Sequence, residues 1–525
     1  MKIVLIGATN IINQRHLNND PINGNLHELL RREGHECCSI YNKSKDEVLD
    51  FVGDFQPDYL CVSINFTMDF GELSDLLKNI KTRVPWCKII GCGPYITACR
   101  EYIISDGNFD VFDVFVVGQP EISILKMVGG GEIKRFPNFP KVICGEDFED
   151  VNTLPFPDNQ YRNEVSTRIS WGCKFNCLFC QDKLISGKYQ YRTVDNVIDE
   201  LKTLYEKRDP NREFWIMFSD LDFLAITGSN PKWIPTFVDK VKENGLKFNF
   251  SIQTRANWIS DEIVSLLKEI GLKSIGIGVE AGSERVLKLY NKGIKDVSYN
   301  VESIKTLIRL GVAYKMNFIM YEPTTTMDDI RKNIEYFYKC GYPAGATPSQ
   351  PAASFFDRLA LFPETDAHKY FKAQDGVNLR VDNGRVKYEF RDREVAVFYK
   401  YVRKWRENVR SLNQIYFFLL NNTYDLNQYI CSEQKRRELL MKLLILQQKY
   451  LKIDLEFLDE LAHTDIADES ALLGVVDKYS VSAKAVEGKL TALKNYYLGK
   501  EVEIAINSHT LNTRGYHRQM RSILT

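Results

Sequence analysis

Short apolar runs alternate with amphipathic stretches over the first quarter of the chain. The runs predict strands because they are short and rich in β-branched side chains, and the stretches between them carry apolar residues at helical spacing. Strands are expected over residues 2–7, 36–41, 59–64, 88–91 and 114–117, and helices over 26–33, 46–52 and 71–84. Strands that alternate with helices favour a parallel sheet covered on both faces. Residues 1–128 are therefore expected to form a doubly wound α/β domain.

The alternation pauses over residues 129–160 and then resumes. Gly129-Gly130-Gly131 and the prolines Pro137, Pro140, Pro155 and Pro157 predict an extended linker. Residues 161–370 contain six expected strands and six expected helices, which predicts a partial (β/α)6 barrel. The expected strands cover 165–170, 214–219, 248–253, 274–279, 314–320 and 354–361, and the expected helices cover 193–207, 231–243, 261–270, 284–290, 297–310 and 327–340.

Beyond residue 370 the pattern becomes helical and aromatic. Helices are expected over 394–421, 432–457, 468–479 and 482–497. Aromatic side chains at helical spacing are typical of a core. Residues 371–525 are therefore expected to form a mostly helical domain that closes the open side of the barrel and shapes a substrate pocket.

Composition narrows the classes of partner and the compartment. Lys+Arg and Asp+Glu are equal at 69 each over 525 residues, so no net charge attracts nucleic acid or an anionic membrane. The chain has no stretch of about 18 uncharged apolar residues, and its first residues resemble a strand more than a signal peptide. The 12 cysteines fall mostly in apolar runs, as reduced thiols do in the cytoplasm. A cytoplasmic protein without a membrane or nucleic-acid partner is expected.

Three cysteines with C-x3-C-x2-C spacing follow the first strand of the expected barrel: Cys173, Cys177 and Cys180. Thiolates favour zinc, copper or iron–sulfur clusters, and a closed zinc site has four protein ligands. The next cysteine is Cys340 and the next histidine is His368. Three ligands without a fourth suit a 4Fe-4S cluster with one open iron. A zinc site completed from afar and three buried thiols are the alternatives.

The carboxyl ends of the expected barrel strands carry polar residues, which in such barrels build the functional site. Asp220 and Asp222 follow the second strand, and Gln253-Thr254-Arg255 ends the third. Glu280 lies in a G-x-E-x-G turn after the fourth strand, and Asn317 lies in the fifth. Carboxylates accept hydrogen bonds from ammonium and ribose hydroxyl groups, and a guanidinium binds a carboxylate. Salt bridges at the barrel rim are the alternative for Asp220, Arg255 and Glu280.

The cysteine motif, with aromatic Phe179 directly before its last cysteine, resembles the radical S-adenosylmethionine (SAM) superfamily. The resemblance implies that SAM chelates the open iron, and that one electron from the cluster cleaves SAM to methionine and a 5′-deoxyadenosyl radical. It implies SAM contacts for Asp220, Arg255, Glu280 and Asn317, and it puts Phe179 beside the adenine.

Three further segments resemble the subclass of these enzymes that contains a cobalamin-binding domain. They are Gly91-Cys92-Gly93-Pro94, Val117-Gly118-Gln119-Pro120 and the N-T-L-P-F-P sequence at 152–157. The resemblance implies that residues 1–128 are a Rossmann-like domain that holds a corrinoid above the cluster, with Gly91, Gly93 and Gly118 at the binding site. The usual D-x-H-x-x-G motif, whose histidine ligates cobalt, is absent, and the first loop offers only His16. Members without that histidine hold the corrinoid with no protein ligand on cobalt; a domain kept only for packing or dimerisation is the alternative.

Together these features predict a cobalamin-dependent radical SAM methyltransferase that methylates an unactivated carbon. The alternatives are a radical rearrangement or oxidation with a degenerate cobalamin domain, and a non-catalytic iron–sulfur redox protein. The expected partners are a small-molecule or peptide substrate and an electron donor such as flavodoxin or ferredoxin. The sequence identifies neither the substrate nor a catalytic side chain.

Overall fold

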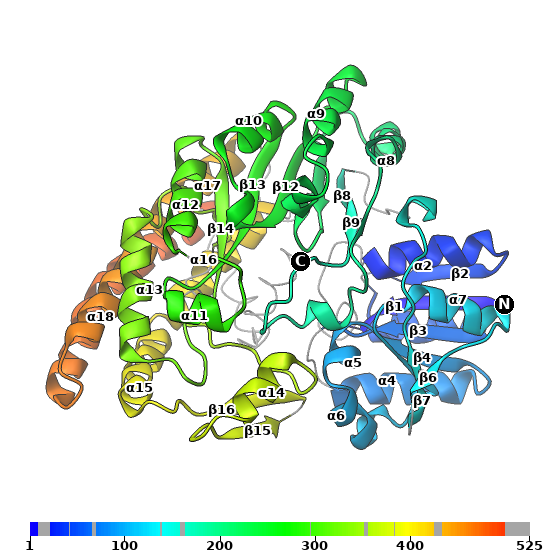
Figure 1. The fold of residues 1–525 in the computed structure, drawn as a ribbon, viewed down its shortest axis with the longest axis horizontal. Helices are drawn as coiled ribbons and strands as arrows, with labels where there is room; N and C mark the ends of the chain where they lie inside the picture. Colours follow the sequence, from blue (N-terminus) through cyan, green and yellow to red (C-terminus); the bar gives the residue numbers. More distant parts are fainter. Residues whose placement is uncertain are drawn as a thin grey trace.

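A computed structural model describes most of the chain (Figure 1). The described residues are 1–8, 21–40, 43–65, 70–136, 139–157, 163–294, 296–350, 355–382, 384–424 and 433–498. His16, considered above as a cobalt ligand, lies outside these ranges.

The first domain is built on a seven-stranded sheet in the order β2-β1-β3-β4-β5-β7-β6, parallel except for β6. Its strands are β1 (Lys2–Gly7), β2 (Glu36–Ile40), β3 (Tyr59–Ser63), β4 (Lys88–Cys92), β5 (Val114–Val117), β6 (Arg135–Phe136) and β7 (Phe139–Cys144). Its helices are α2 (Pro21–Arg32), α3 (Lys45–Phe55), α4 (Phe70–Arg83), α5 (Pro94–Ala98), α6 (Arg100–Ser105) and α7 (Glu121–Gly129). Apolar residues of α2 and α7 share one core with the sheet, and those of α3 and α4 share another. This two-sided cover confirms the doubly wound fold.

The segment expected to be an extended linker has two roles in the structure. Its strand β7 pairs parallel with β5 and so extends the first sheet. Farther along, Asn152 accepts a 2.8 Å hydrogen bond from the backbone N–H of Thr193, directly before the helix α8 (Val194–Lys207) of the second domain. The Phe156 ring lies against the buried guanidinium of Arg192. The described part of the linker therefore contacts both domains.

The second domain contains a parallel sheet in the order β14-β13-β12-β11-β8. Its strands are β8 (Glu164–Thr167), β11 (Trp215–Phe218), β12 (Asn249–Arg255), β13 (Leu272–Glu280) and β14 (Ala313–Phe318), and β9 (Ser170–Trp171) pairs separately with β10 (Gln190–Tyr191). The helices are α8 (Val194–Lys207), α9 (Trp233–Glu243), α10 (Asp261–Glu269), α11 (Glu284–Leu289), α12 (Ser298–Arg309) and α13 (Met327–Lys339). Figure 1 shows α9, α10, α12 and α13 on the outside of the curved sheet and the short α11 below its strands.

The segment expected to supply a sixth strand is irregular where the structure describes it. Arg358 forms a single parallel bridge with Tyr321, and Leu361 a single antiparallel bridge with Val386. The chain turns at Phe355, whose buried ring packs between Phe337 and Tyr342. This ring packing takes the place of a regular ladder at that edge of the barrel.

The last part of the chain comprises α14 (Asp366–Lys372), the hairpin β15 (Leu379–Asp382) and β16 (Arg385–Tyr388), and the long helices α15 (Arg393–Asn408), α16 (Arg410–Tyr424), α17 (Glu433–His463) and α18 (Glu469–Leu498). The single helix expected over 394–421 is thus broken at Val409, whereas the two expected over 468–497 are one. Helix α17 packs on the barrel. Its Gln447 donates hydrogen bonds to the carbonyls of Thr347 and Gln350, which follow α13 in the barrel domain. The tail therefore covers one side of the barrel. No helix in the described part of the chain is both long and apolar enough to cross a membrane.

A strap formed by residues 358–388 fastens the first domain to the rest of the protein. Phe362 is buried in the core of the first domain. Arg100 and Glu364 form an ion pair at 2.9 Å, with both side chains mostly buried. At the tip of the hairpin, the Cys99 thiol donates to the carbonyl of Gly384 at 2.9 Å. Cores and polar contacts from distant parts of the sequence thus join the two domains.

We expect Gly384→Ala to weaken this junction. A Cβ atom at Gly384 would lie 2.2 Å from the Tyr95 hydroxyl, and its φ of +68° is in the left-handed region. Gly311→Ala is the matched control, since its φ is +63° and its Cβ would meet nothing within 4 Å. The control should lose about 1–2 kcal/mol from backbone strain, and Gly384→Ala about 1–3 kcal/mol more from overpacking. Equal drops in the calorimetric melting temperature would contradict the role assigned to the strap.

Candidate functional site

The cysteine motif occupies a loop directly after β9. Gly172 starts this loop with a φ of +75°, where a Cβ atom would lie 2.6 Å from the Lys188 carbonyl oxygen. A turn closes the loop, with the N–H of Cys180 donating to the carbonyl of Cys177 at 3.1 Å. No three His, Cys, Asp or Glu side chains among the described residues lie close enough to hold a single metal ion. A cluster does not require such convergence, because each thiolate binds a different iron.

The end of helix α11 holds the cysteine loop in place. The carbonyl of Tyr290 accepts a hydrogen bond from the N–H of Leu178 at 3.0 Å. The Asn291 side chain donates to the carbonyl of Asn176, also at 3.0 Å. The rings of Phe179 and Tyr290 meet edge to face with centroids 5.0 Å apart. Phe179 is thus fixed on the apolar surface of the barrel and remains partly exposed.

Arg255, at the end of β12, contacts the cysteine loop directly. Its Nη1 lies 3.4 Å from the Sγ of Cys177, within hydrogen-bond range of a thiolate. The guanidinium stacks on the Phe175 ring at 3.7 Å from the centroid. Its side chain also donates to Asn257. The predicted site residue therefore reaches the loop, and its charge lies beside a candidate ligand sulfur.

Asp220 faces the start of the cysteine loop. It is 2% exposed and accepts hydrogen bonds from the Ser170 N–H at 2.6 Å, the Ser170 hydroxyl at 2.5 Å and the Ile169 N–H at 3.2 Å. Burial raises the pKa of Asp220 to about 6, although these hydrogen bonds act to lower it. The bonds fix the turn between β8 and β9, so Asp220 shapes the approach to the loop.

Asp222 binds the end of β12 from the neighbouring strand end. It accepts hydrogen bonds from the Thr254 hydroxyl at 2.6 Å and from the Trp258 indole at 3.0 Å. Burial raises the pKa of this carboxyl above its usual value. Asp222 therefore supports the strand segment that carries Arg255.

Glu280 lies at the end of β13 with a φ of +68°, a value that residues other than glycine rarely adopt. The register between β13 and β14 shifts at this point. The carboxylate accepts a 2.7 Å hydrogen bond from Lys292 Nζ, and both side chains are buried. Asn317 pairs in register with Gly278 and is half-buried at the same edge of the sheet. Glu280 and Asn317 therefore share the strand edge where a ligand is expected.

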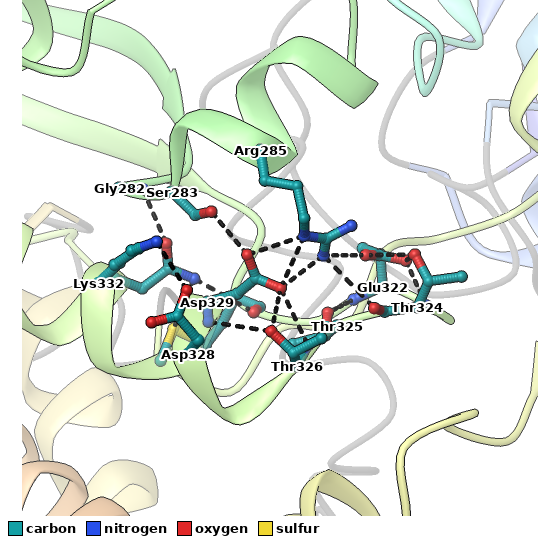
Figure 2. A network of polar contacts seen from close by, with 12 residues as sticks. Gly282, Ser283, Arg285, Glu322, Thr324, Thr325, Thr326, Asp328, Asp329 and Lys332 are labelled. Carbon is teal, nitrogen blue, oxygen red and sulfur yellow. Dashed lines mark hydrogen bonds and ion pairs between the residues drawn. The ribbon is translucent and has the colours of Figure 1, made fainter.

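A polar network ties together the loops after β13 and β14 (Figure 2). The Arg285 guanidinium donates to Asp329, with Nε 3.0 Å from each carboxylate oxygen, and to Glu322 at 3.0 Å. Ser283 also donates to Asp329, at 2.6 Å. Burial acts to raise the pKa of Asp329, but the hydrogen bonds from Arg285 and Ser283 lower it overall. Because Asp329 and Glu322 are both buried, this cation holds the two loops in fixed relative positions.

The first domain presents the carboxyl ends of its strands to the barrel (Figure 1). Helix α5, directly after β4, contacts residues 182–184 just beyond the cysteine loop. Packing inside the first domain requires glycine at positions 91 and 93. A Cβ atom at Gly91 would lie 2.9 Å from the Phe115 ring, and one at Gly93 would lie 2.9 Å from the Ile64 carbonyl oxygen. Gly118 adopts a φ of +90°. Beside it, the buried Gln119 amide nitrogen has no hydrogen-bond partner among the described residues.

Several residues of the site could not be identified from sequence alone. Lys292, Asn291 and Arg285 lie on or beside α11, where charged residues usually face solvent. The Asn291-Lys292-Gly293 sequence indicates a turn after a helix, which is the one local signal for this segment. Lys292 contacts Glu280, Asn291 contacts the cysteine loop, and Arg285 contacts Glu322 and Asp329. These contacts depend on the tertiary fold.

Known families and proteins resemble this chain in sequence over the barrel that carries the site. The family model of the radical SAM superfamily matches residues 168–337. The chain is 23% identical over 344 residues to an uncharacterised methyltransferase of Pyrococcus horikoshii, which covers 59% of this chain and 71% of that protein. It is also 23% identical over 317 residues to the hopanoid C-3 methylase of Methylococcus capsulatus, which covers 56% of this chain and 59% of the methylase.

Solved structures resemble the chain beyond the barrel. The cobalamin-dependent SAM radical enzyme OxsB, solved with aqua-cobalamin and SAM bound, has a TM-score of 0.73 and 15% identity over 99% of this chain and 83% of OxsB. The radical SAM methyltransferase TsrM from Kitasatospora setae has a TM-score of 0.55 and 14% identity over 73% of this chain and 79% of TsrM. At these identities the likeness shows the fold, and it includes the first domain and the helical tail.

The raised pKa of Asp220 predicts a specific pH dependence of stability. The pKa of Asp220 is about 6 in the folded protein, against an ordinary value of 3.8. As the pH rises toward 6 and above, the folded protein must ionise this buried carboxyl, which lowers its stability. Between pH 5 and 7.5 the wild type should therefore lose about 1.4 kcal/mol of unfolding free energy relative to Asp220→Asn. Urea unfolding across this range measures the difference. Asp110→Asn, at an exposed position, is the control, and its free energy of unfolding should change with pH as that of wild type does. If the free energy of unfolding of Asp220→Asn also followed that of wild type, the raised pKa assigned to Asp220 would be refuted.

Proposed function

Residues 168–337 match the family model of the radical SAM superfamily, and from that match we propose that this chain is a cobalamin-dependent radical SAM enzyme that methylates an unactivated carbon. The observation that carries the proposal is the anchored cysteine loop, which lies between the strand ends of the barrel and the first domain. Arg255 and the end of α11 hold this loop from one side, and α5 meets the following residues from the other.

The residues of the barrel fit a cluster and SAM. Cys173, Cys177 and Cys180 supply the three thiolates, and no further cysteine or histidine is near them in sequence. Thiolates are the ligands that iron–sulfur clusters require. When bound, the cluster supplies the electron that cleaves SAM to the 5′-deoxyadenosyl radical.

Side chains around the loop offer complementary groups for SAM. Arg255 provides a cation for a carboxylate, Glu280 an acceptor for ammonium or ribose hydroxyls, and Asn317 both donor and acceptor. Phe179 presents a partly exposed ring for the adenine. The buried, hydrogen-bonded setting of Arg255 and Glu280 keeps them in fixed positions before a ligand arrives.

The first domain fits a corrinoid at its strand ends, where parallel sheets bind ligands. Within the described part of the chain the buried Gln119 amide nitrogen lacks a hydrogen-bond partner, as expected for a group that donates to a ligand. OxsB, whose structure contains aqua-cobalamin, has the same fold over nearly the whole chain. A corrinoid held here supplies the methyl group. Gly91, Gly93 and Gly118 shape the backbone of this edge.

One observation favours a second candidate, a radical reaction without methylation. Gly91 and Gly93 are needed for packing inside the first domain, so their presence alone does not require a corrinoid. In that case the domain is degenerate and the barrel performs a rearrangement or oxidation. Both candidates act in the cytoplasm on a small-molecule or peptide substrate and take electrons from a donor such as flavodoxin or ferredoxin.

Removing one ligand tests the cluster. We expect anaerobically purified Cys177→Ala to lose most of its iron and sulfide, because two thiolates hold a cluster poorly. Cys144→Ala, a half-buried cysteine in the first domain, is the matched control and should retain wild-type iron. Iron and sulfide analysis with electron paramagnetic resonance measures both. A wild-type protein without a cluster after reconstitution would end the proposal.

Corrinoid binding separates the two candidates. We expect wild type to bind hydroxocobalamin, and Gln119→Leu to bind it about 3- to 10-fold more weakly, because one hydrogen bond to the ligand is lost. Iron content should be the same in both proteins. Release of S-adenosylhomocysteine only when corrinoid is present would support methyl transfer. A cluster that cleaves SAM in a protein that never binds corrinoid would favour the non-methylating reaction.

A further inference from the structure

The turn that ends helix α11 has an unusual backbone. Asn291 has a φ of +50° and Gly293 a φ of +72°, so two of three consecutive residues are left-handed. The N–H of Asn291 donates to the Lys288 carbonyl, and the N–H of Lys292 to the Leu287 carbonyl, both at 3.1 Å. These bonds fix the turn and point the intervening lysine into the protein.

One side of this turn holds the cysteine loop. Tyr290 accepts the hydrogen bond from Leu178, and Asn291 donates to the carbonyl of Asn176, as described above. Both contacts use groups of the turn, so the position of the loop depends on the position of the turn.

The other side of the turn holds Glu280. Lys292 is only 3% exposed, and its Nζ lies 2.7 Å from Glu280 Oε1. The pair packs over the bare backbone of Gly278, where a Cβ atom would lie 2.8 Å from Glu280 Oε1 and 2.9 Å from Lys292 Nζ. A side chain at residue 278 would thus separate the two charges.

Stability alone explains this arrangement poorly. A buried ion pair is often no more stabilising than apolar residues of the same size, because both charges lose their hydration. Glu280 also adopts a left-handed backbone conformation, which costs about 1–3 kcal/mol. Strain and a buried charge pair at a strand end are typical of groups held in place for a ligand.

We infer that the turn Tyr290-Asn291-Lys292-Gly293 is a clamp that fixes the cysteine loop and the Glu280 carboxylate relative to each other, with Lys292 as the positioning residue for Glu280. This inference rests on the proposed function, in which Glu280 contacts SAM. Lys292 leaves the second carboxylate oxygen of Glu280 available and neutralises part of its charge. The clamp thereby sets the distance between the cluster and the group that receives SAM.

Lys292→Met tests the side of the clamp that holds Glu280, because methionine nearly matches lysine in length and has no charge. We expect wild-type iron and sulfide content and an unchanged resonance spectrum of the reduced cluster. SAM should bind about 10- to 100-fold more weakly in equilibrium dialysis, as for the loss of a charge-assisted hydrogen bond. Lys292→Arg should restore most of the affinity, and Lys494→Met, which removes a buried lysine of α18, should bind as wild type does.

Asn291→Gly tests the opposite side, because glycine keeps the left-handed turn and removes only the bond to Asn176. We expect this variant to retain less iron, and the clusters that remain to bind SAM with wild-type affinity.

The possible failures are distinguishable. A Lys292→Met protein that binds SAM like wild type, or that loses its cluster, would overturn the clamp and leave the proposed function standing. A wild-type protein that holds a cluster but does not bind SAM would overturn the proposed function itself.

Discussion

The cysteine loop has almost no regular structure of its own, so its shape depends on the contacts that surround it. Hydrogen bonds from the end of α11 hold its middle, and Arg255 stacks on Phe175 beside the Sγ of Cys177. Asp220 fixes the turn that leads into it. Charged and polar groups from the ends of two strands, β11 and β12, and from the end of α11 therefore fix the backbone of the loop. The remaining architecture serves to bring these strand ends together.

The parallel order of the strands brings these strand ends together. In a sheet of the order β14-β13-β12-β11-β8, all carboxyl ends lie on one edge, so residues far apart in the sequence, such as Asn176 and Asn291, become neighbours. The buried carboxylates of Glu322 and Asp329 would be costly without a cation, and Arg285 provides it from the first turn of α11. The same compensation recurs between Glu280 and Lys292. In each case the cation offsets the cost of burying the carboxylate, and the ion pair fixes the segment that carries it.

The junction between domains follows a different principle. Phe362 of the strap packs into the core of the first domain, and Arg100 and Glu364 form an ion pair beside it. Buried apolar area supplies most of the attraction, and the polar contacts select one orientation. This orientation directs the strand ends of the first sheet toward the barrel (Figure 1).

The sequence determined the repeating elements and the identity of the chemically distinctive groups. Apolar periodicity predicted the parallel strands of both domains, and the spacing of Cys173, Cys177 and Cys180 indicated a cluster, because these signals are local. Tertiary structure decided what local patterns cannot carry: the break at Val409, the irregular chain at Phe355, and the pairing of β7 with the first sheet. It also decided the partners of the candidate residues, turning Asp220 toward Ser170 and bringing Lys292 to Glu280. Such contacts depend on the relative placement of strand ends, and only the folded sheet fixes that placement.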